Sequence, residues 1–211
     1  MNTTTVSTPL VAAIETVWKS IQDRHEDVPA VVVTLGSGTA KQGMKLGHFA
    51  ADRWMRGDEL VHELFVGGEG LQRGGVGVLG TLLHEAAHGA ARAREIQDTS
   101  RQGRFHNAKF RAIGEEFGLN LEKDPSIGWS VTTVPADTER SYADEITTLD
   151  GGLVAYRLTE MSAGGRKSNN NGVTALCGCG RKIRVSKTVY AAGPISCGLC
   201  GSDFEAEDDD E

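Results

Sequence analysis

The stretch from Val78 to Arg94 carries the residues with the most evident chemistry, because it contains His84, Glu85 and His88 in an H-E-x-x-H pattern. On a helix with 3.6 residues per turn, two histidines four positions apart lie on one face and can bind a single metal cation. Glu85 is rotated by about 100° from His84, so it is suited to deprotonating a water at the metal instead of binding the metal itself. The pattern indicates the chemistry of a zinc peptidase.

A five-residue motif also occurs by chance, so two further features bear on this interpretation. The motif helix has a broad apolar face formed by Leu79, Leu82, Leu83, Ala86, Ala87 and Ala90, as expected of a buried helix. A third histidine, His106, is spaced i, i+4, i+7, i+11 with Phe110, Ile113 and Phe117, which predicts that it lies on the inward stripe of a second helix. Three protein ligands with water in the fourth position are typical of catalytic zinc, whereas structural zinc has four.

The elements that must position these residues are predicted from periodicity and from Gly and Pro. Thr8 as N-cap and Pro9 at the first turn predict a helix to about Arg24. Tyr142, Ile146, Leu149 and Leu153 predict a third long helix, although Gly151 and Gly152 weaken it. Residues 120–135 are expected to be irregular with short extended pieces, and Trp129 among them to anchor the core. Strands are predicted at Ala30–Leu35, Leu46–Ala51 and Leu60–Val66, with a loop or hairpin turn at 36–43 and a glycine-rich connection at 67–77 that leads into the motif helix.

The strand Leu60–Val66 is the candidate for an edge that pairs with an extended substrate, and an interior strand paired on both sides is the alternative. The polar segment Ile96–Gly103 joins the two histidine-bearing helices and runs beside the predicted metal, where substrate contacts could come from Asp98, Thr99 or Arg101. The remaining histidines are interpreted structurally. His62 is expected to be an ordinary strand residue, and surface or packing roles are expected for His25 and His48.

All four cysteines fall near the C-terminus, in Cys177-Gly-Cys179-Gly and Cys197-Gly-Leu-Cys200-Gly. Cysteine pairs followed by glycine are typical of zinc knuckles, because glycine allows a tight turn that points amides at the thiolates. Strands over 182–189 and before Cys197 would complete a zinc ribbon. The first pair is one residue shorter than the usual C-x-x-C, so reduced free thiols are the alternative. Residues 162–172, rich in Ser, Gly and Asn, form a flexible linker by composition.

Charge is distributed unevenly over the 211 residues, whose net charge is −7. Residues 1–160 carry 16 basic and 22 acidic side chains, whereas residues 161–202 carry six basic side chains and no acidic one. Any nucleic-acid contact is therefore expected in the C-terminal module, although solvated charges on a small domain would look the same. The candidate nucleic-acid-binding residues are Arg166, Lys167, Arg181, Lys182, Arg184 and Lys187.

The remaining composition is that of an ordinary water-soluble chain. No apolar run approaches the ~20 residues that span a bilayer, and the N-terminus lacks the layout of a signal peptide. We therefore expect a cytoplasmic protein, bacterial or phage-encoded, with no membrane contact. Clustered cysteines in a reducing compartment indicate metal binding more readily than disulfides.

Several segments together resemble the SprT-like (Spartan-type) zinc metalloproteases, which include bacterial and phage members. These segments are LLHEAAH, RFHNAKF, GHFAADRW, HELFVGGE, DTSRQG and the C-terminal cysteine ribbon, and the likeness covers roughly residues 45–200. The resemblance implies His84, His88 and His106 as ligands of a catalytic zinc and Glu85 as the general base. It also implies proteolysis of DNA-bound proteins, including DNA–protein crosslinks, with a small zinc module that helps to engage DNA.

The predicted organisation is an α+β, zincin-like metalloprotease domain over residues 1–160, in which a small sheet packs on the helices that carry the motif. A linker (161–172), a β zinc ribbon (173–204) and an acidic tail (205–211) follow. The ribbon would hold a second, structural zinc on Cys177, Cys179, Cys197 and Cys200. Two alternatives remain open: a non-catalytic zinc protein that binds DNA or a partner through the ribbon, and a peptidase for one dedicated regulatory protein.

Overall fold

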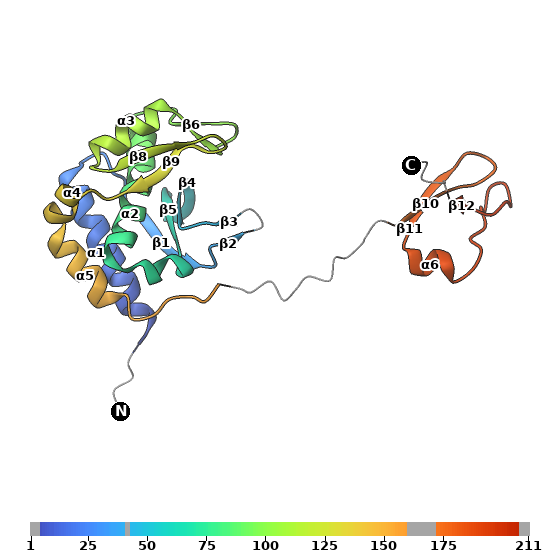
Figure 1. Cartoon of the computed structure of the whole chain (residues 1–211), viewed down its shortest axis with the longest axis horizontal. Coiled ribbons are helices and arrows are strands. Elements are labelled where there is room, and N and C mark those ends of the chain that lie inside the picture. Colours follow the sequence, from blue (N-terminus) through green and yellow to red (C-terminus); the bar gives the residue numbers. More distant parts are fainter. Residues whose placement is uncertain (1–4, 41–42, 160–171, 207–211) are drawn as a thin grey trace. The chain divides into compact units, whose positions relative to one another are not determined.

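The chain forms two compact units, Met1–Glu160 and Met161–Glu211, and mixes helices with small sheets (Figure 1). This computed structural model describes residues 5–40, 43–159 and 172–206. Within these residues, no helix has the length and apolar character needed to cross a membrane. The predicted linker lies outside the described residues except for Gly172, and so do residues 207–211 of the predicted tail.

Three helices enclose the core of the N-terminal unit: α1 (Ser7–Arg24) packs against α2 (Gly74–Ala93) and α5 (Ala143–Gly152). The predicted first helix is confirmed, but it begins at Ser7 and has no side-chain N-cap, so the assignment of that role to Thr8 was wrong. The predicted third helix is α5, a helix of 10 residues that ends at Gly152, and the short helix α4 (Ala136–Ser141) precedes it. The core side chains of α1 follow helical spacing and are Leu10, Ala13, Ile14, Val17, Trp18 and Ile21.

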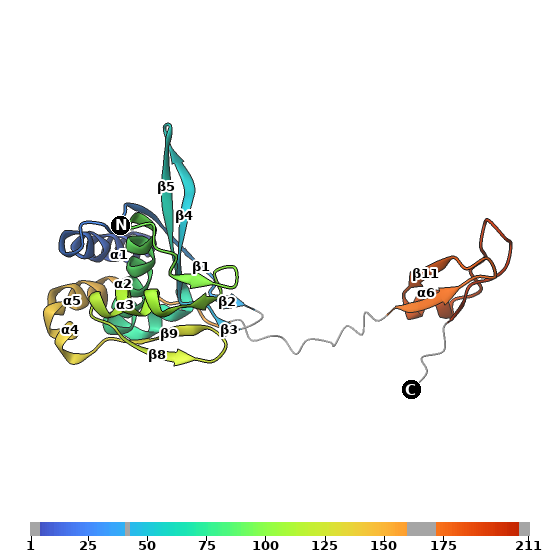
Figure 2. The same ribbon diagram turned by 90° about the horizontal axis from the view of Figure 1, so that it is seen from above.

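The main sheet has the order β1-β5-β4, with β1 (Val31–Gly36) parallel and β4 (Gly47–Arg56) antiparallel to the central β5 (Glu59–Gly67). The strand proposed as the substrate edge is therefore interior, and that prediction was wrong. The two edge strands are β1 and β4, and β4 is the one whose backbone bonds to Glu85 of the H-E-x-x-H motif. An alternating apolar pattern shows which face of a strand is buried but not which strand is outermost. Figure 2 shows the distal parts of β4 and β5 projecting from the unit as a hairpin.

Smaller elements complete the N-terminal unit. The glycine-rich connection at 67–77 forms the 3₁₀ helix η1 (Gly68–Arg73) and the start of α2. Of the two possibilities at 36–43, the hairpin is the one observed, formed by β2 (Thr39–Ala40) and β3 (Gly43–Met44). Residues 120–135 form an ordered hairpin, and Trp129 in it lies half-buried beneath Arg111 instead of anchoring the core. The second sheet has the order β6-β7-β9-β8, formed by Thr99–Ser100, Phe105–His106, Gly128–Thr133 and Asn120–Asp124, respectively.

The C-terminal unit is a three-stranded antiparallel sheet with the order β11-β10-β12. The strand predicted over 182–189 ends at Val185 and continues as the short helix α6 (Lys187–Ala191), and the run before Cys197 is not a strand. The predicted tail begins too early, because Glu205–Ala206 is the strand β12. The buried apolar residues of this unit are Ala175, Cys177, Cys197 and Phe204, and β10 and β11 span Val173–Leu176 and Lys182–Val185.

The fully buried carboxylate of Glu69, in η1, links two distant segments of the N-terminal unit through hydrogen bonds and an ion pair. It accepts hydrogen bonds from Gly38 N (2.7 Å) and Thr39 Oγ1 (2.8 Å), and it pairs with Arg157 Nη1 (2.6 Å). These donors, of which the Gly38 amide is the strongest, lower the pKa of Glu69 to about 2. The ionised carboxylate thereby joins the turn before β2 to the segment that follows α5.

We expect Glu69→Gln to destabilise the N-terminal unit at neutral pH but much less in acid. The folded-state pKa of about 2 lies below the ordinary value of 4.5, so the stabilisation is complete above pH 4.5 and is lost as the pH falls towards 2. Urea unfolding at pH 7 and pH 2.5 measures this, with the exposed Glu15→Gln on α1 as the control. An equal difference between wild type and Glu69→Gln at both pH values would contradict the prediction.

Candidate metal centre

The helix α2 presents His84 and His88 one turn apart, as the H-E-x-x-H spacing predicts. The helix starts four residues earlier than the predicted stretch and has a wider buried face. This face fixes the rotation of α2 about its axis, because its leucines and alanines fill the core between α1, α3 (Ala108–Glu116) and α5. Its buried apolar residues are Val78, Leu79, Leu82, Leu83, Ala86, Ala87, Ala90 and Ala91.

His106 reaches the centre from the short strand β7 and not from a helix, so the prediction of a second histidine-bearing helix was wrong in this respect. The helix α3 (Ala108–Glu116) begins after it, with Asn107 as N-cap, whose side-chain oxygen accepts from Lys109 N (2.7 Å) and Phe110 N (3.3 Å). An Asn N-cap has extended backbone angles, so the helix starts only after Asn107 and does not include His106. The spacing of Phe110 and Ile113 correctly identifies the buried face of α3.

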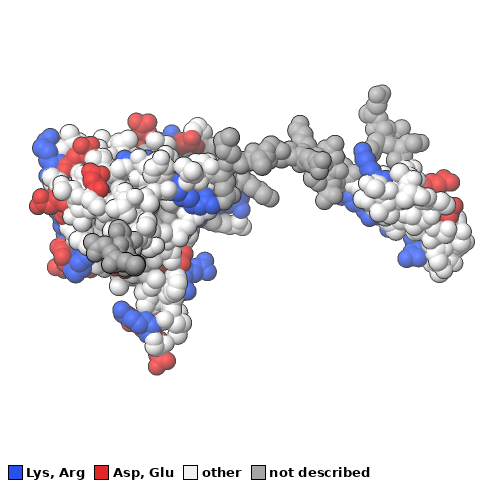
Figure 3. Space-filling model, turned by 90° about the horizontal axis from the view of Figure 1, so that it is seen from below, with Lys and Arg blue, Asp and Glu red and all other residues white. Residues whose placement is uncertain are grey.

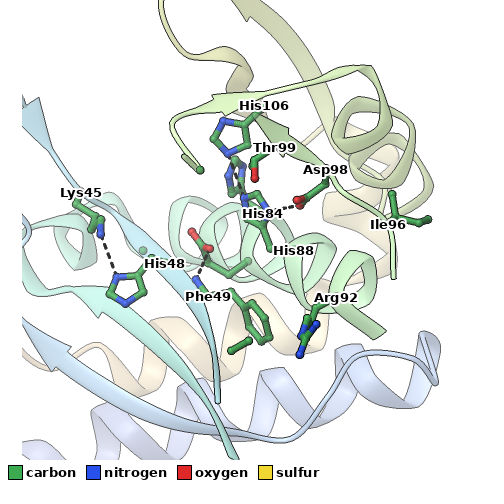
Figure 4. A pocket seen from close by; sticks show the side chains of 14 residues that line it. Lys45, His48, Phe49, His84, His88, Arg92, Ile96, Asp98, Thr99 and His106 are labelled. Atoms are coloured by element: carbon green, nitrogen blue, oxygen red, sulfur yellow. Dashed lines mark hydrogen bonds and ion pairs between the residues drawn. The ribbon is translucent and has the colours of Figure 1, made fainter. Parts of the chain in front are cut away.

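The three imidazoles converge, and their ligand nitrogens lie within 4.8 Å of one another. Figure 4 shows His84, His88 and His106 grouped above α2, and the Nε2 atoms of His88 and His106 are 3.1 Å apart. Zinc binds imidazole nitrogens at about 2.0–2.1 Å, so tetrahedral ligands are about 3.3 Å from one another. The ring of the buried Phe110 contacts all three histidines, with centroid distances of 4.4–4.7 Å.

The surroundings of His84 and His106 favour the neutral imidazole, the protonation state that metal binding requires. Burial lowers the pKa of His84 well below its ordinary value, and His88 and His106 lower it further. Burial also lowers the pKa of His106, again assisted by His88. The residues therefore fit a zinc ion in their number, their atom type, their spacing and their charge.

Asp98 orients His88, a role that the sequence reasoning missed. Its Oδ2 atom lies 2.5 Å from His88 Nδ1, which leaves Nε2 directed towards the other two histidines (Figure 4). A carboxylate on the distal ring nitrogen fixes the tautomer of a metal-binding histidine and strengthens the ligand. Thr99 lines the same cavity, whereas Arg101 stacks on Phe105 and does not line it.

Replacing Asp98 with asparagine should lower zinc affinity by about 10- to 100-fold without unfolding the protein. The amide still accepts a hydrogen bond from His88 but lacks the negative charge that stabilises the bound cation. Competition with a chromogenic chelator measures the affinity, and Asp58→Asn, in the exposed turn between β4 and β5, serves as the control. Unchanged affinity would show that Asp98 only packs against the ring.

Glu85 is buried beside the three histidines and is held by the edge strand β4. Its Oε2 atom accepts a hydrogen bond from Phe49 N at 2.7 Å. Burial raises the pKa of Glu85, while His88 and the Phe49 amide act in the opposite direction. The close approach of β4 depends on Gly47, because a Cβ there would lie 2.7 Å from Thr81 Cγ2 and 3.0 Å from Glu85 Oε1.

A cavity of about 450 Å³ opens in front of the centre, between α2, the start of β4 and the Asp98 segment. His48 lines it, with Nδ1 3.2 Å from Lys45 Nζ and Nε2 3.1 Å from Glu63 Oε1 (Figure 4). His48 also stacks on Phe65, in keeping with the predicted packing role, but its place in the cavity wall was not predicted. His25 stacks on Phe117 and is a packing residue, and His62 lies on β5, as expected.

Comparison with known proteins identifies no relative. No family model, no curated protein and no solved structure matches the chain. The function is therefore inferred from the geometry of the site and from the sequence motifs.

The four cysteines of the C-terminal unit also converge, with their sulfurs within 4.8 Å of one another. The short first pair does not prevent this, because Cys179 Sγ lies 3.2 Å from Cys177 Sγ and 3.8 Å from Cys197 Sγ. Two matching turns hold the pairs, with Gly180 N bonded to Cys177 O (2.9 Å) and Gly201 N to Cys197 O (2.8 Å). Both glycines have a left-handed φ, 80° and 75°.

Donors within the cysteine turns favour ionised sulfur at two of the four positions. The amides of Cys200 and Leu199 lower the pKa of Cys197, and hydrogen bonds from Ser202 lower that of Cys200 to about 6. A hydrogen bond with Cys177 raises the pKa of Cys179 to about 12. Lowered pKa values at Cys197 and Cys200 together with a raised one at Cys179 are typical of neighbouring thiols that share protons. Four convergent sulfurs are the donor set of a structural zinc site.

The structure describes only some of the candidate nucleic-acid-binding residues, and these differ in their surroundings. Arg166 and Lys167 lie outside the described residues. Lys182 and Arg184 lie two positions apart on β11 and therefore share one face, while Arg181 Nη1 is 3.6 Å from Cys197 Sγ. Figure 3 shows basic and acidic side chains of this unit at different places on the face in view.

Proposed function

We propose that the chain is a zinc-dependent endopeptidase with a zincin-like catalytic domain of the SprT-like type. One observation carries the proposal: His84, His88 and His106 converge beside a cavity, with Glu85 between them and the edge strand β4. Among the described residues, this cluster contains three ligands and no fourth. Three protein ligands leave a coordination position open, as catalysis requires.

The three histidines and Glu85 would have separate roles in peptide hydrolysis. The three histidines would hold the zinc, which when bound lowers the pKa of a coordinated water towards ~7 and polarises a carbonyl. Glu85 is placed to accept the proton of the attacking water and to deliver it to the leaving amine. The Phe49 amide holds one carboxylate oxygen of Glu85, which fixes the orientation of this carboxylate beside the histidines.

The edge strand β4 offers a way to hold a protein substrate independently of its sequence. The amide of Phe49 points away from β5, because it donates to Glu85. Backbone groups alternate in direction along a strand, so the backbone of Gly47 also faces the cavity. An extended peptide can add to such an edge through main-chain hydrogen bonds.

We further propose that the substrates are DNA-associated proteins and that the cysteine unit, with a structural zinc, contacts DNA. Support comes from the pairing of an H-E-x-x-H centre with a four-cysteine unit, as the resemblance to SprT-like proteases implies. The exposed Lys182 and Arg184 on one face of β11 are suited to phosphate contacts.

Metal content and proteolysis of a DNA-binding protein, measured with and without single-stranded DNA, test the proposal. We expect two zinc ions per chain and cleavage that DNA stimulates. Two zinc ions without cleavage of any protein would favour a non-catalytic zinc protein. Cleavage that ignores DNA would remove the DNA-directed part of the proposal and favour a peptidase for a dedicated substrate.

A further inference from the structure

Lys45, in the connection between β3 and β4, is a cationic residue that lines two cavities at the metal centre. The first is the cavity described above. The second, the apolar cavity, has a volume of about 780 Å³ and includes Leu46, Val76 and Val134 in its wall. Five residues line both cavities and therefore mark the place where the two meet. Apart from Lys45, all of them belong to the centre already described: Gly47, His84, Glu85 and His106.

The backbone around this lysine is fixed, so the side chain starts from a defined point. Lys45 N donates to Gly38 O at 2.7 Å, and Leu46 O accepts from Gly67 N at 2.8 Å. The charge of the side chain also reaches the site. Burial raises the pKa of Glu85, and Lys45 is among the groups that act against this rise. The ammonium therefore lies within electrostatic range of the proposed base.

A chain of hydrogen bonds holds the ammonium in place. Lys45 Nζ lies 3.2 Å from His48 Nδ1, and His48 Nε2 lies 3.1 Å from Glu63 Oε1. The other oxygen of Glu63 accepts a hydrogen bond from Trp54 Nε1 at 3.0 Å. An ammonium can only donate and a carboxylate can only accept, so a neutral His48 with its proton on Nε2 satisfies both neighbours. The exposed Lys45 is thus tied to a ring that is itself anchored on β5.

This arrangement leaves the ammonium able to bind an anion. Within the part of the chain that the structure describes, Lys45 forms no ion pair, and its Nζ has no hydrogen-bond partner besides His48. An ammonium carries three N–H donors, so two remain for a ligand in the cavity. Figure 4 shows Lys45 and His48 together on a different wall of the cavity from His84, His88 and His106. A substrate between these walls would meet the metal on one side and the ammonium on the other.

Peptide hydrolysis creates negative charge at one atom, the oxygen of the scissile carbonyl. When the oxygen of water bonds to the carbonyl carbon, the π electron pair moves to the carbonyl oxygen and a proton of the water passes to Glu85. The pair re-forms the carbonyl when the C–N bond breaks, and the amine leaves with the bonding pair and takes the proton from Glu85. Donors aimed at this oxygen stabilise the transition state, and loss of one costs about 10²–10³-fold in kcat.

We propose that Lys45 is a further catalytic residue, whose ammonium donates to the oxygen of the scissile carbonyl as negative charge develops there. His48 and Glu63 are positioning residues that act through Lys45. The inference rests on the proposed peptidase function and adds a catalytic group to the same centre. An ordinary solvated lysine would have neither this anchoring chain nor a place where the two cavities meet.

Steady-state kinetics of the zinc-loaded full-length chain test the role of Lys45. Lys45→Met keeps the length of the side chain but removes its charge, and we expect kcat to fall by about 10²-fold. KM should stay nearly unchanged, because the negative charge develops only on the way to the transition state. Lys45→Arg, which keeps the charge, should recover part of the lost kcat. The control is Lys123→Met, an exposed position on β8 outside both cavities, which should match wild type.

The variant His48→Phe tests the positioning role. It keeps a ring that can stack on Phe65 but removes the acceptor of Lys45 Nζ. We expect a smaller loss of kcat than in Lys45→Met, and no further loss when the two substitutions are combined. Losses that add fully in the double variant would show that His48 does not act through Lys45.

Ligand binding provides a readout that does not depend on turnover. The probe is an alanine hexapeptide whose central amide is replaced by a phosphinate, a tetrahedral anion, and the parent hexapeptide is the comparison. Both are titrated calorimetrically into Glu85→Gln protein with and without Lys45→Met. Loss of the ammonium should weaken binding of the phosphinate by about 10²-fold, as for any donor to the developing anion, and leave binding of the parent peptide unchanged.

The outcomes separate the inference from the function on which it rests. Unchanged kcat in Lys45→Met, or a loss confined to KM, would overturn the inference and leave the peptidase intact. Absence of cleavage by the wild-type chain would overturn the peptidase function. In that case, phosphinate binding that depends on Lys45 would retain it as an anion-binding group, and phosphinate binding that does not would overturn this role as well.

Discussion

Replacement of Glu85 by glutamine should lower kcat/KM for proteolysis by about 10³-fold, within the range that general acid–base catalysis supplies. Glutamine keeps the size of the side chain and can still accept a hydrogen bond from Phe49 N. It cannot take a proton from water at neutral pH, so the step that generates the nucleophile is lost. Zinc content should remain unchanged, because Glu85 is not among the convergent ligands.

Steady-state cleavage of a quenched fluorescent protein, with zinc measured on the same samples, separates these two effects. Glu122→Gln, an exposed residue of β8, is the matched control and should retain full activity. Activity of Glu85→Gln within a factor of two of wild type would refute the assignment of Glu85 as the base. Loss of zinc together with activity would instead show that Glu85 holds the metal.

Removal of metal from the cysteine cluster should unfold the C-terminal unit and leave the N-terminal unit folded. Two of the four buried residues in the C-terminal core are Cys177 and Cys197, so little apolar packing remains without the metal. Structural zinc contributes about 10–16 kcal/mol of apparent binding free energy in small zinc-finger peptides, far more than a core of this size provides. The N-terminal core contains no cysteine.

Amide hydrogen exchange of the full-length chain resolves the two units. Upon chelation, the amides of β10 and β11 should lose protection by several orders of magnitude, while those of α1 and α2 keep it. Cys197→Ala should have the same effect without chelator, whereas Leu199→Ala, an exposed residue of the same turn, should not. Full protection of β10 in chelator would show that the four sulfurs are not a structural metal site.

The sequence alone determined the parts of the site that depend on local periodicity. The H-E-x-x-H spacing places two histidines on one face of α2, and the leucines and alanines of the same helix identify the buried face. Clustered cysteines followed by glycine likewise predict a compact group, since each of the two turns of the C-terminal unit is closed within four or five consecutive residues. Such signals are local, and neighbouring residues suffice to read them.

Only the tertiary structure decided which strand borders the centre, that Asp98 orients His88, and that His106 arrives on a strand. The strand β5 is not an edge strand because β1, from a distant part of the chain, pairs with the side of β5 that β4 leaves open. The apolar cavity likewise combines residues from four separated segments. Strand order and cavity shape arise from long-range packing, which hydrophobic alternation along one segment cannot specify.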